Sequence, residues 1–292
     1  MRLQKKLASG EFVILAEMEP PKGSDVSALI ANATNVKQKV DAFVIPEMNN
    51  AVMKMSSLGG SLLLQSRGLE TVMQVCCRDR NRLALQGDLL AAQALGVANV
   101  MAVTGEDITH GDHHKAKAVN DLDILELLGA IKTLESGKDM AGVELRGAPQ
   151  FLVGATVKVA AGGAALDQEL AALDQKIALG ARFFVTTPIF DLKVLEDFMQ
   201  KFSGRQAEII PTVLLLKSVG MARYINRHLV HQTTIPEAYI SRIQNAPERV
   251  RECVQIAGEL VASLKDGGYS GVVISPIGWE DKIPAILAAA GV

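Results

Sequence analysis

The first apolar run of the chain, FVILAEMEPPKGSD at residues 12–25, decides between two fold classes. Residues 12–17 have the length and the uninterrupted apolar character of a strand that is buried on both faces. In a doubly wound nucleotide-binding sheet, a glycine-rich turn normally follows this strand. Here the turn reads EMEPPKG, so that fingerprint is absent and a barrel is favoured.

The pattern of this first strand recurs along the whole chain. Apolar runs of the same kind are predicted as strands at residues 42–47, 71–76, 99–104, 151–158, 182–190, 208–216 and 271–277. Amphipathic stretches are predicted as helices at residues 25–40, 58–66, 80–95, 122–134, 168–179, 192–202, 219–228 and 247–264. This alternation over 292 residues predicts an α/β fold, a (β/α)8 TIM barrel in a single domain spanning residues 1–292.

Helix starts are predicted from acidic or hydroxyl residues that precede the amphipathic stretches. The expected N-caps are Ser24, Asp79, Asp121, Asp167, Asp191 and Ser218. Within residues 58–66, the pair Gly59–Gly60 predicts a break in the helix.

Composition and charge exclude several classes of function. The net charge of −2 offers neither a basic surface for nucleic acid nor a polybasic patch for a membrane. No apolar run approaches the roughly 20 residues that a membrane-spanning helix needs. The three cysteines, Cys76, Cys77 and Cys253, form no disulfide framework, and the N-terminus lacks the apolar core of a signal peptide. We therefore expect a cytoplasmic protein.

The ends of the strands supply the candidate catalytic groups, because barrel enzymes react at the C-terminal face of the strands. Glu17 ends the first strand, and an apolar pocket there would raise the pKa of its carboxyl and make it a proton donor. The alternative is a structural ion pair with a lysine or arginine. Glu19 is expected to turn away, since the two acids would repel each other.

Three other features have a competing chemical interpretation. The stretch HGDHH, residues 110–114, is predicted to be a solvated loop, and no metal site is expected. The adjacent cysteines are interpreted as small buried residues, because no histidine lies nearby in sequence to activate them. Lys158, near the end of the fifth strand, could form a Schiff base as in an aldolase.

Several motifs in order resemble the flavin-dependent methylenetetrahydrofolate reductases. They are AEMEPP, QVCCRDRNRLALQGDLLAAQALG, VMAVTGED, LDQKIALGARFFVTTPIFD and IIPTVLLL, and they extend over nearly the whole chain. The stretch CRDRN is most similar to the branch found in acetogenic and related anaerobic bacteria. The resemblance implies a (β/α)8 barrel that holds a flavin, usually FAD, and reduces 5,10-methylenetetrahydrofolate to 5-methyltetrahydrofolate.

The resemblance also assigns roles to individual residues. Glu17 would be the general acid that protonates the folate, and Glu106 would be the acid at the pyrimidine edge of the flavin. The flavin-binding positions would be Glu47, Asn49, Gln74, Thr104, Gly105, Glu106, Asp121, Thr156 and Lys176. The folate-binding positions would be Glu17, Glu106, Thr187, Phe190 and Trp279.

The electron source and the exact flavin stay open at this point. Well-known bacterial members stack NADH on an aromatic residue early in the seventh helix, where this chain has Val219. We therefore expect electrons from NAD(P)H or from a partner subunit, an iron–sulfur or flavin protein. Gln74, Thr104 and Thr156 differ from the residues that are common at these positions in the family, so FMN stays open as the alternative to FAD. Homo-oligomerisation, a Schiff-base lyase using Lys158 and a non-catalytic folate-binding subunit also stay open.

Overall fold

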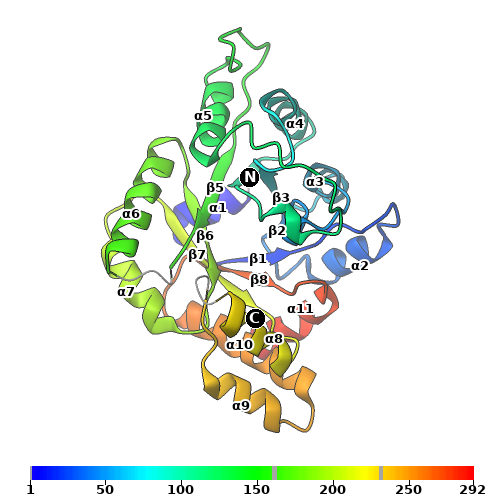
Figure 1. The fold of residues 1–292 in the computed structure, drawn as a ribbon, viewed down its shortest axis with the longest axis vertical. Coiled ribbons are helices and arrows are strands. Elements are labelled where there is room, and N and C mark those ends of the chain that lie inside the picture. Colours follow the sequence, from blue (N-terminus) through cyan, green and yellow to red (C-terminus); the bar gives the residue numbers. More distant parts are fainter. Residues whose placement is uncertain (1, 160–162, 230–232) are drawn as a thin grey trace.

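Eight parallel strands close into a barrel in the computed structural model, which describes residues 2–159, 163–229 and 233–292. Each strand pairs with its neighbours in chain order, and β1 pairs with β8 to complete the ring (Figure 1). The strands are β1 (Val13–Glu17), β2 (Ala42–Ile45), β3 (Thr71–Cys76), β4 (Asn99–Val103), β5 (Leu152–Val157), β6 (Phe183–Pro188), β7 (Glu208–Leu214) and β8 (Gly271–Ser275). The predicted (β/α)8 barrel is confirmed, and the open doubly wound sheet is excluded.

A ring of α-helices surrounds the strands. The helices are α1 (Arg2–Ser9), α2 (Ser27–Val36), α3 (Ser57–Gln65), α4 (Arg82–Ala94), α5 (Ile124–Glu135), α6 (Gly163–Ala178), α7 (Leu192–Phe202), α8 (Val219–His228), α9 (Glu237–Asn245), α10 (Arg249–Asp266) and α11 (Ile283–Ala289). Short 3₁₀ turns lie at Asn49–Ala51, Ile108–His110 and Glu280–Lys282. The sequence did not predict α1, α9 or α11.

Several predicted helix starts are wrong, because a neighbouring residue makes the cap instead. Asn81 caps α4 in place of Asp79, and Asp123 caps α5 in place of Asp121, with its own N–H donating back to the Glu126 carboxylate. Val26 precedes α2 without any side-chain cap, so Ser24 is not its N-cap. The predicted caps of α7 and α8, Asp191 and Ser218, are confirmed. The described part of α6 already begins at Gly163, so Asp167 lies inside it.

The glycine pair in α3 packs the helix and does not break it. Ser56 caps α3, which runs unbroken from Ser57 to Gln65. A Cβ atom on Gly60 would lie 2.9 Å from Cγ2 of Ile45 and 3.0 Å from Cγ of Pro20. Gly60 therefore lets α3 approach the barrel closely.

The interior of the barrel is closed at its N-terminal end by α1. Leu3 and Leu7 of this helix join the inward-facing cluster of strand residues. Phe183 of β6 belongs to this cluster and lies against Gly154 of β5, where a Cβ atom would be 2.2 Å from the Phe183 ring. The barrel interior is thus a packed core below the C-terminal ends of its strands.

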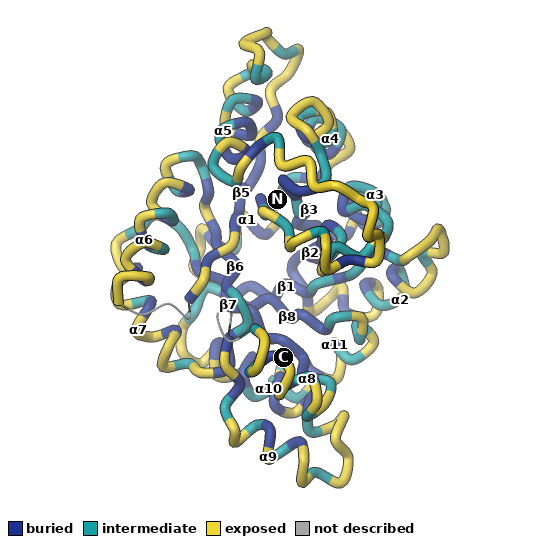
Figure 2. The backbone as a smooth tube through the Cα atoms, viewed as in Figure 1, coloured by how far each residue is buried: buried dark blue, intermediate teal, exposed yellow. Residues whose placement is uncertain are grey.

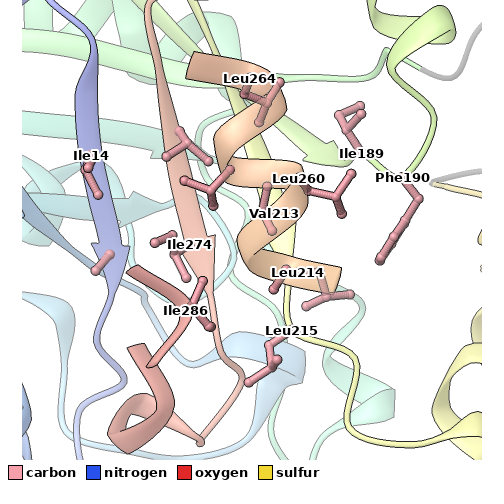
Figure 3. Close-up of a cluster of buried hydrophobic side chains, with 14 of the residues drawn as sticks. Ile14, Ile189, Phe190, Val213, Leu214, Leu215, Leu260, Leu264, Ile274 and Ile286 are labelled. Atoms are coloured by element: carbon pink, nitrogen blue, oxygen red, sulfur yellow. The ribbon is translucent and has the colours of Figure 1, made fainter. Parts of the chain in front are cut away.

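The outer faces of the strands form the larger apolar layer with the surrounding helices. Leu260 and Leu264 of α10 face Val213 of β7 and Ile274 of β8 in this layer (Figure 3). The strands are buried on both faces, while the outer turns of the helices are exposed (Figure 2). This is why the strands appear in the sequence as continuous apolar runs. Among the helices described here, none has the length and apolar character that crossing a membrane requires.

Candidate functional site

A cavity of about 380 Å³ opens at the C-terminal end of the barrel. Its size falls within the range of small-molecule and cofactor sites. Strands on opposite sides of the barrel contribute to it, and α8 closes one side. The residues predicted from the sequence that line this cavity are Glu17, Asn49, Gln74, Glu106 and Thr156.

Glu17 lies at the end of β1 with its carboxyl enclosed by the cavity wall. Burial raises the pKa of this carboxyl from 4.5 to about 8, and the negative charges of Glu19, Glu280 and Glu106 add to the rise. The hydroxyl of Ser275 acts in the opposite direction. No lysine or arginine among the described residues pairs with Glu17, so a structural ion pair does not explain its position.

Glu19 turns away from this cavity, as predicted. Its carboxylate forms an ion pair with Lys54, and Glu19 is not part of the cavity wall. The two acids of the AEMEPP motif therefore have different surroundings. Glu17 lies in the cavity wall without a paired cation among the described residues, and Glu19 is neutralised in a partly buried ion pair.

Asn49 is the hydrogen-bond donor to Glu17. Its Nδ2 lies 3.1 Å from Glu17 Oε1. The preceding residue, Met48, has φ of +48° and ends the segment that follows β2. This left-handed conformation is uncommon for a side-chain-bearing residue, so other contacts must hold it.

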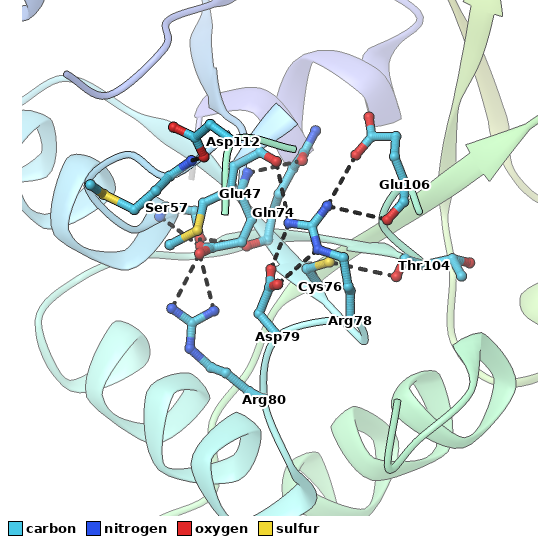
Figure 4. Close-up of polar contacts among 12 residues, drawn as sticks. Glu47, Ser57, Gln74, Cys76, Arg78, Asp79, Arg80, Thr104, Glu106 and Asp112 are labelled. Atoms are coloured by element: carbon cyan, nitrogen blue, oxygen red, sulfur yellow. Dashed lines mark hydrogen bonds and ion pairs between the residues drawn. The ribbon is translucent and has the colours of Figure 1, made fainter. Parts of the chain in front are cut away.

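Glu106 lies beyond the end of β4 and lines the opposite side of the cavity. Arg78, at the end of β3, approaches both its backbone carbonyl and its carboxylate at 3.4 Å (Figure 4). Arg78 is only 2% exposed, and Asp79 accepts a two-pronged pair of hydrogen bonds from it at 2.7 Å. Arg78 belongs to the CRDRN stretch at the end of the third predicted strand, and the sequence assigned it no role.

Gly105 is required by the packing of the protein itself. Its φ is +87°, and a Cβ atom there would lie 2.6 Å from Sγ of Cys76 and 2.9 Å from Cβ of Arg78. Both the conformation and the space exclude a side chain. Thr104 beside it accepts a bond from Cys76 Sγ through its backbone carbonyl. Neither residue lines the described cavity.

Glu47 is buried beneath the cavity and its carboxylate is already satisfied. Ser57 donates to Oε2 through its backbone N–H and its hydroxyl, at 2.8 and 2.5 Å. Arg80 donates to Oε1 at 3.2 Å. The backbone N–H of Glu47 donates to Gln74 Oε1 at 3.1 Å, which orients a residue of the cavity wall. Glu47 thus supports the wall from behind.

Two residues predicted to contact the cofactor, Lys176 and Asp121, instead form hydrogen bonds within the protein. Lys176 donates to the backbone carbonyl of Thr156 at 2.9 Å, and burial lowers the pKa of its ammonium. Both carboxylate oxygens of Asp121 accept bonds from Arg82. Neither Lys176 nor Asp121 lines the cavity.

The other three predicted folate contacts, Thr187, Phe190 and Trp279, do not line this cavity. Thr187 Oγ1 is buried without a partner in the described residues. Phe190 lines an adjoining cavity of about 360 Å³ that shares Pro188 with the first. The ring of Trp279 lies 5.2 Å from the ammonium of Lys217 at the rim of the barrel.

Helix α8 brings to the cavity an aromatic residue that was not predicted from the sequence. Tyr224 is 59% exposed yet belongs to the wall, and its ring lies 4.6 Å from the ring of His228. Val219, the position taken from the resemblance, packs against the core. Tyr224 lies five residues after Val219, on a different face of the same helix, so the position of Val219 did not point to it.

The other candidate chemistries receive no support from the geometry. Asp112 of the HGDHH stretch pairs with Lys22 and His113, and no group of metal-ligating residues is found in the parts of the chain that are described. Burial raises the pKa of the Cys76 thiol to about 12, which suits an inert residue. Lys158 is exposed and lies outside the cavity wall.

Comparison with known proteins identifies a family that matches this chain and several structures of similar fold. The methylenetetrahydrofolate reductase family matches residues 2–291. A Clostridium thermocellum protein whose structure binds two copies of 5-methyl-5,6,7,8-tetrahydrofolic acid is 15% identical with a TM-score of 0.64, over 99% of this chain and 98% of that one. A 2,3-dimethylmalate lyase is 12% identical with a TM-score of 0.56, over 99% and 81% of the two chains. Identities this low show a common fold alone.

A match to ribonuclease R 1 of Lactococcus lactis subsp. lactis (strain IL1403) is of a different kind. It is 28% identical over 117 residues, which cover 39% of this chain and only 13% of that protein. A segment that short says nothing about the whole. The family match, in contrast, extends over nearly all of this sequence, and the protein belongs to the methylenetetrahydrofolate reductase family.

Proposed function

We propose that this protein reduces 5,10-methylenetetrahydrofolate to 5-methyltetrahydrofolate, with Glu17 as the general acid. The observation that carries the proposal is a carboxyl held in the cavity wall with a pKa of about 8 and no paired cation in the described chain. Such a group keeps its proton near neutral pH and can donate it. Family membership and the folate named for the Clostridium thermocellum neighbour support the choice of substrate.

The work of Glu17 is to move one proton. Protonation of a bridge nitrogen of the folate weakens its bond to the methylene carbon, and the bridge opens to a cationic iminium. Asn49, through its contact with Oε1, orients the carboxyl for this step. The negative charge of Glu106 on the opposite wall favours the cation that forms.

The chemistry of the wall fits a flavin ring. Gln74, Glu106, Asn49 and Thr156 offer amide, carboxylate and hydroxyl groups around one cavity, which suits the polar edge of a planar heterocycle. When bound there, a flavin would supply the hydride that reduces the methylene carbon. FAD is the cofactor that we propose. Lys176 bonds to Thr156 within the protein, so it adds no support for FAD over FMN.

For the electron source we propose a partner subunit, an iron–sulfur or flavin protein, with NAD(P)H as the alternative. Val219 is aliphatic and packs against the core, so it gives NADH no aromatic ring to stack on. Tyr224 does offer one on the same helix, and it favours the alternative. Mixing the flavin-loaded protein with NADH without oxygen separates the two, because rapid bleaching of the flavin by NADH alone contradicts the need for a partner.

Two other functions compete with reduction. A Schiff-base lyase needs a desolvated lysine, and the exposed position of Lys158 disfavours it. A non-catalytic folate-binding subunit would use the same cavity. It would, however, have no need of a proton donor in the wall, which is why reduction is the better proposal.

The first test is direct. The purified protein is supplied with FAD or FMN, its absorption spectrum is recorded, and the bound cofactor is released for chromatography. The loaded protein is then reduced with dithionite and mixed anaerobically with 5,10-methylenetetrahydrofolate. We expect flavin reoxidation with formation of 5-methyltetrahydrofolate. A protein that stays colourless with both flavins, or a reduced flavin that the folate leaves unchanged, contradicts the proposal.

The rate of reduction is expected to fall as the pH rises above about 8. The folded-state pKa of Glu17 lies above its usual value, so the carboxyl holds its proton below about pH 8 and loses it above. The proton donor is therefore present at neutral pH and lost on the alkaline side. Single-turnover rates between pH 6 and 10 measure this limb, and a rate that stays level through pH 9 would exclude Glu17 as the acid.

A further inference from the structure

Arg78 is a buried cation that contacts one of the two carboxyl groups of the cavity, that of Glu106. It follows β3, is 2% exposed, and does not line the cavity itself. An arginine at such a site must satisfy all its donors within the protein, because a buried guanidinium without partners costs several kcal/mol, on the order of the penalty for any buried ion.

Every N–H group of this guanidinium has an acceptor. Nε and one Nη2 hydrogen donate to the two carboxylate oxygens of Asp79, both at 2.7 Å. Nη2 also donates to the backbone carbonyl of Met48 at 3.2 Å. Nη1 donates to the carbonyl and the carboxylate of Glu106, both at 3.4 Å. This uses the five donors that an arginine has, whereas a lysine has three on a single nitrogen.

The contact with Met48 extends the influence of Arg78 to Glu17. Met48 has a left-handed backbone, and its carbonyl is fixed by the guanidinium. The next residue, Asn49, donates to Glu17 Oε1. A change in the backbone conformation of Met48 would therefore move the side-chain amide of Asn49 and remove its hydrogen bond to the carboxyl of Glu17.

We propose that Arg78 is a positioning residue for both carboxyl groups of the cavity, holding Glu106 directly and Glu17 through Met48 and Asn49. The proposal rests on the proposed function for its consequence in catalysis, but the arrangement itself is independent of it. One guanidinium ties together the loops that follow β2 and β4, so the distance between the proton donor and the opposite carboxylate is set by protein contacts.

The arrangement also prepares the site for a ligand. The side chain of Glu106 is 48% exposed without a ligand, so solvent weakens its attraction to Arg78. A ring that covers Glu106 would remove this solvent and strengthen the pair, since the interaction grows as the local dielectric falls. Because Arg78 is already buried and fully bonded, it need not reorganise when this happens.

The test compares Arg78→Lys with Arg205→Lys. Arg205 makes the same kind of two-pronged pair, with Asp174 at 2.7 and 3.0 Å, and it lies outside the cavity wall. For Arg78→Lys we expect kcat to fall on the order of 100-fold with little change in KM, since a displacement of about 1 Å is enough for such a loss. Arg205→Lys should change stability alone. Rates are normalised to the folded fraction from thermal unfolding.

A second measurement needs neither flavin nor turnover. The titration of Glu17 is followed by NMR in protein labelled with ¹³C-glutamate, and Glu17→Gln assigns the signal. In Arg78→Lys the midpoint should move upward, because the carboxylate form loses the bond from Asn49. The other charges that act on Glu17 are Glu19, Glu280 and Glu106. Arg205→Lys should leave the midpoint in place.

Asp79→Asn keeps the proposal testable if Arg78→Lys does not fold. It preserves the shape of the side chain but removes its charge and one of the two oxygens that accept from Arg78, and it should give smaller changes of the same sign. Unchanged kcat and an unchanged Glu17 midpoint in the folded variants would overturn the proposal. If the wild-type protein reduces no folate, the proposed function fails, and the NMR measurement alone still decides the role of Arg78.

Discussion

Glu17→Gln is expected to lower the rate of folate reduction by about 10²–10⁴-fold, the usual contribution of a general acid. Glutamine has the size of the protonated glutamic acid and can keep the contact with Asn49, but it cannot release a proton. Flavin binding should survive, because the wall keeps its shape. Single-turnover mixing of the reduced, flavin-loaded variant with methylenetetrahydrofolate measures the rate, and the absorption spectrum measures the flavin content.

The stability of the same variant gives an independent check of the pKa. In the wild-type protein, the folded state binds the Glu17 proton more tightly than the unfolded state, whose pKa is near 4.5. Wild-type stability from this group is therefore complete below about pH 4.5 and is lost as the pH rises through about 8. Glu17→Gln has no such loss, so its unfolding free energy relative to wild type should increase over that pH range.

Glu19→Gln is the matched control for the change at Glu17. Glu19 is two residues away, pairs with Lys54 and lies outside the cavity. Its charge is the second cause of the raised pKa of Glu17. The variant should therefore keep most of its rate at pH 6.5 while the alkaline limb moves to lower pH. If Glu17→Gln retains activity and Glu19→Gln does not, the assignment of the acid is wrong.

Gly154→Ala is expected to destabilise the protein by about 3 kcal/mol, at the upper end for overpacking a core. The added Cβ atom would lie 2.2 Å from Cζ of Phe183, whose ring is fully buried in the barrel. Strands β5 and β6 are directly paired at this point, so neither backbone can move away without loss of ladder bonds. Urea-induced unfolding followed by circular dichroism measures the effect.

Two controls separate this clash from the general effect of replacing glycine. Gly87 is an exposed residue within α4, and a Cβ atom there meets nothing within 4 Å. Gly87→Ala should stabilise the protein by about 0.5–1 kcal/mol. Adding Phe183→Leu to Gly154→Ala should restore part of the lost stability by making room. A Gly154→Ala protein as stable as wild type would show that the ring can shift at little cost.

The strands were predictable because each is buried on both faces. Their residues are apolar without alternation, and this signal does not depend on which partners they meet. Helix ends were less predictable, because a cap depends on local geometry. Asp79 and Asp121 both looked suitable, yet Asn81 and Asp123 make the bonds. Asp79 binds its sequence neighbour Arg78 instead, and Asp121 binds Arg82, which only the fold brings to it.

The sequence by itself determined the alternation of strands and helices, and with it the barrel and the edge at which the polar strand ends gather. It also pointed to Glu17, since an acid at the end of an apolar strand is informative without any partner. Only the tertiary structure decided which polar residues face the cavity and which are used by the protein itself. Glu106 and Gln74 line the wall, while Glu47, Lys176 and Asp121 are bonded elsewhere. The physical reason is that burial and hydrogen bonding come from residues distant in sequence, and they decide whether a charged group is free to meet a ligand.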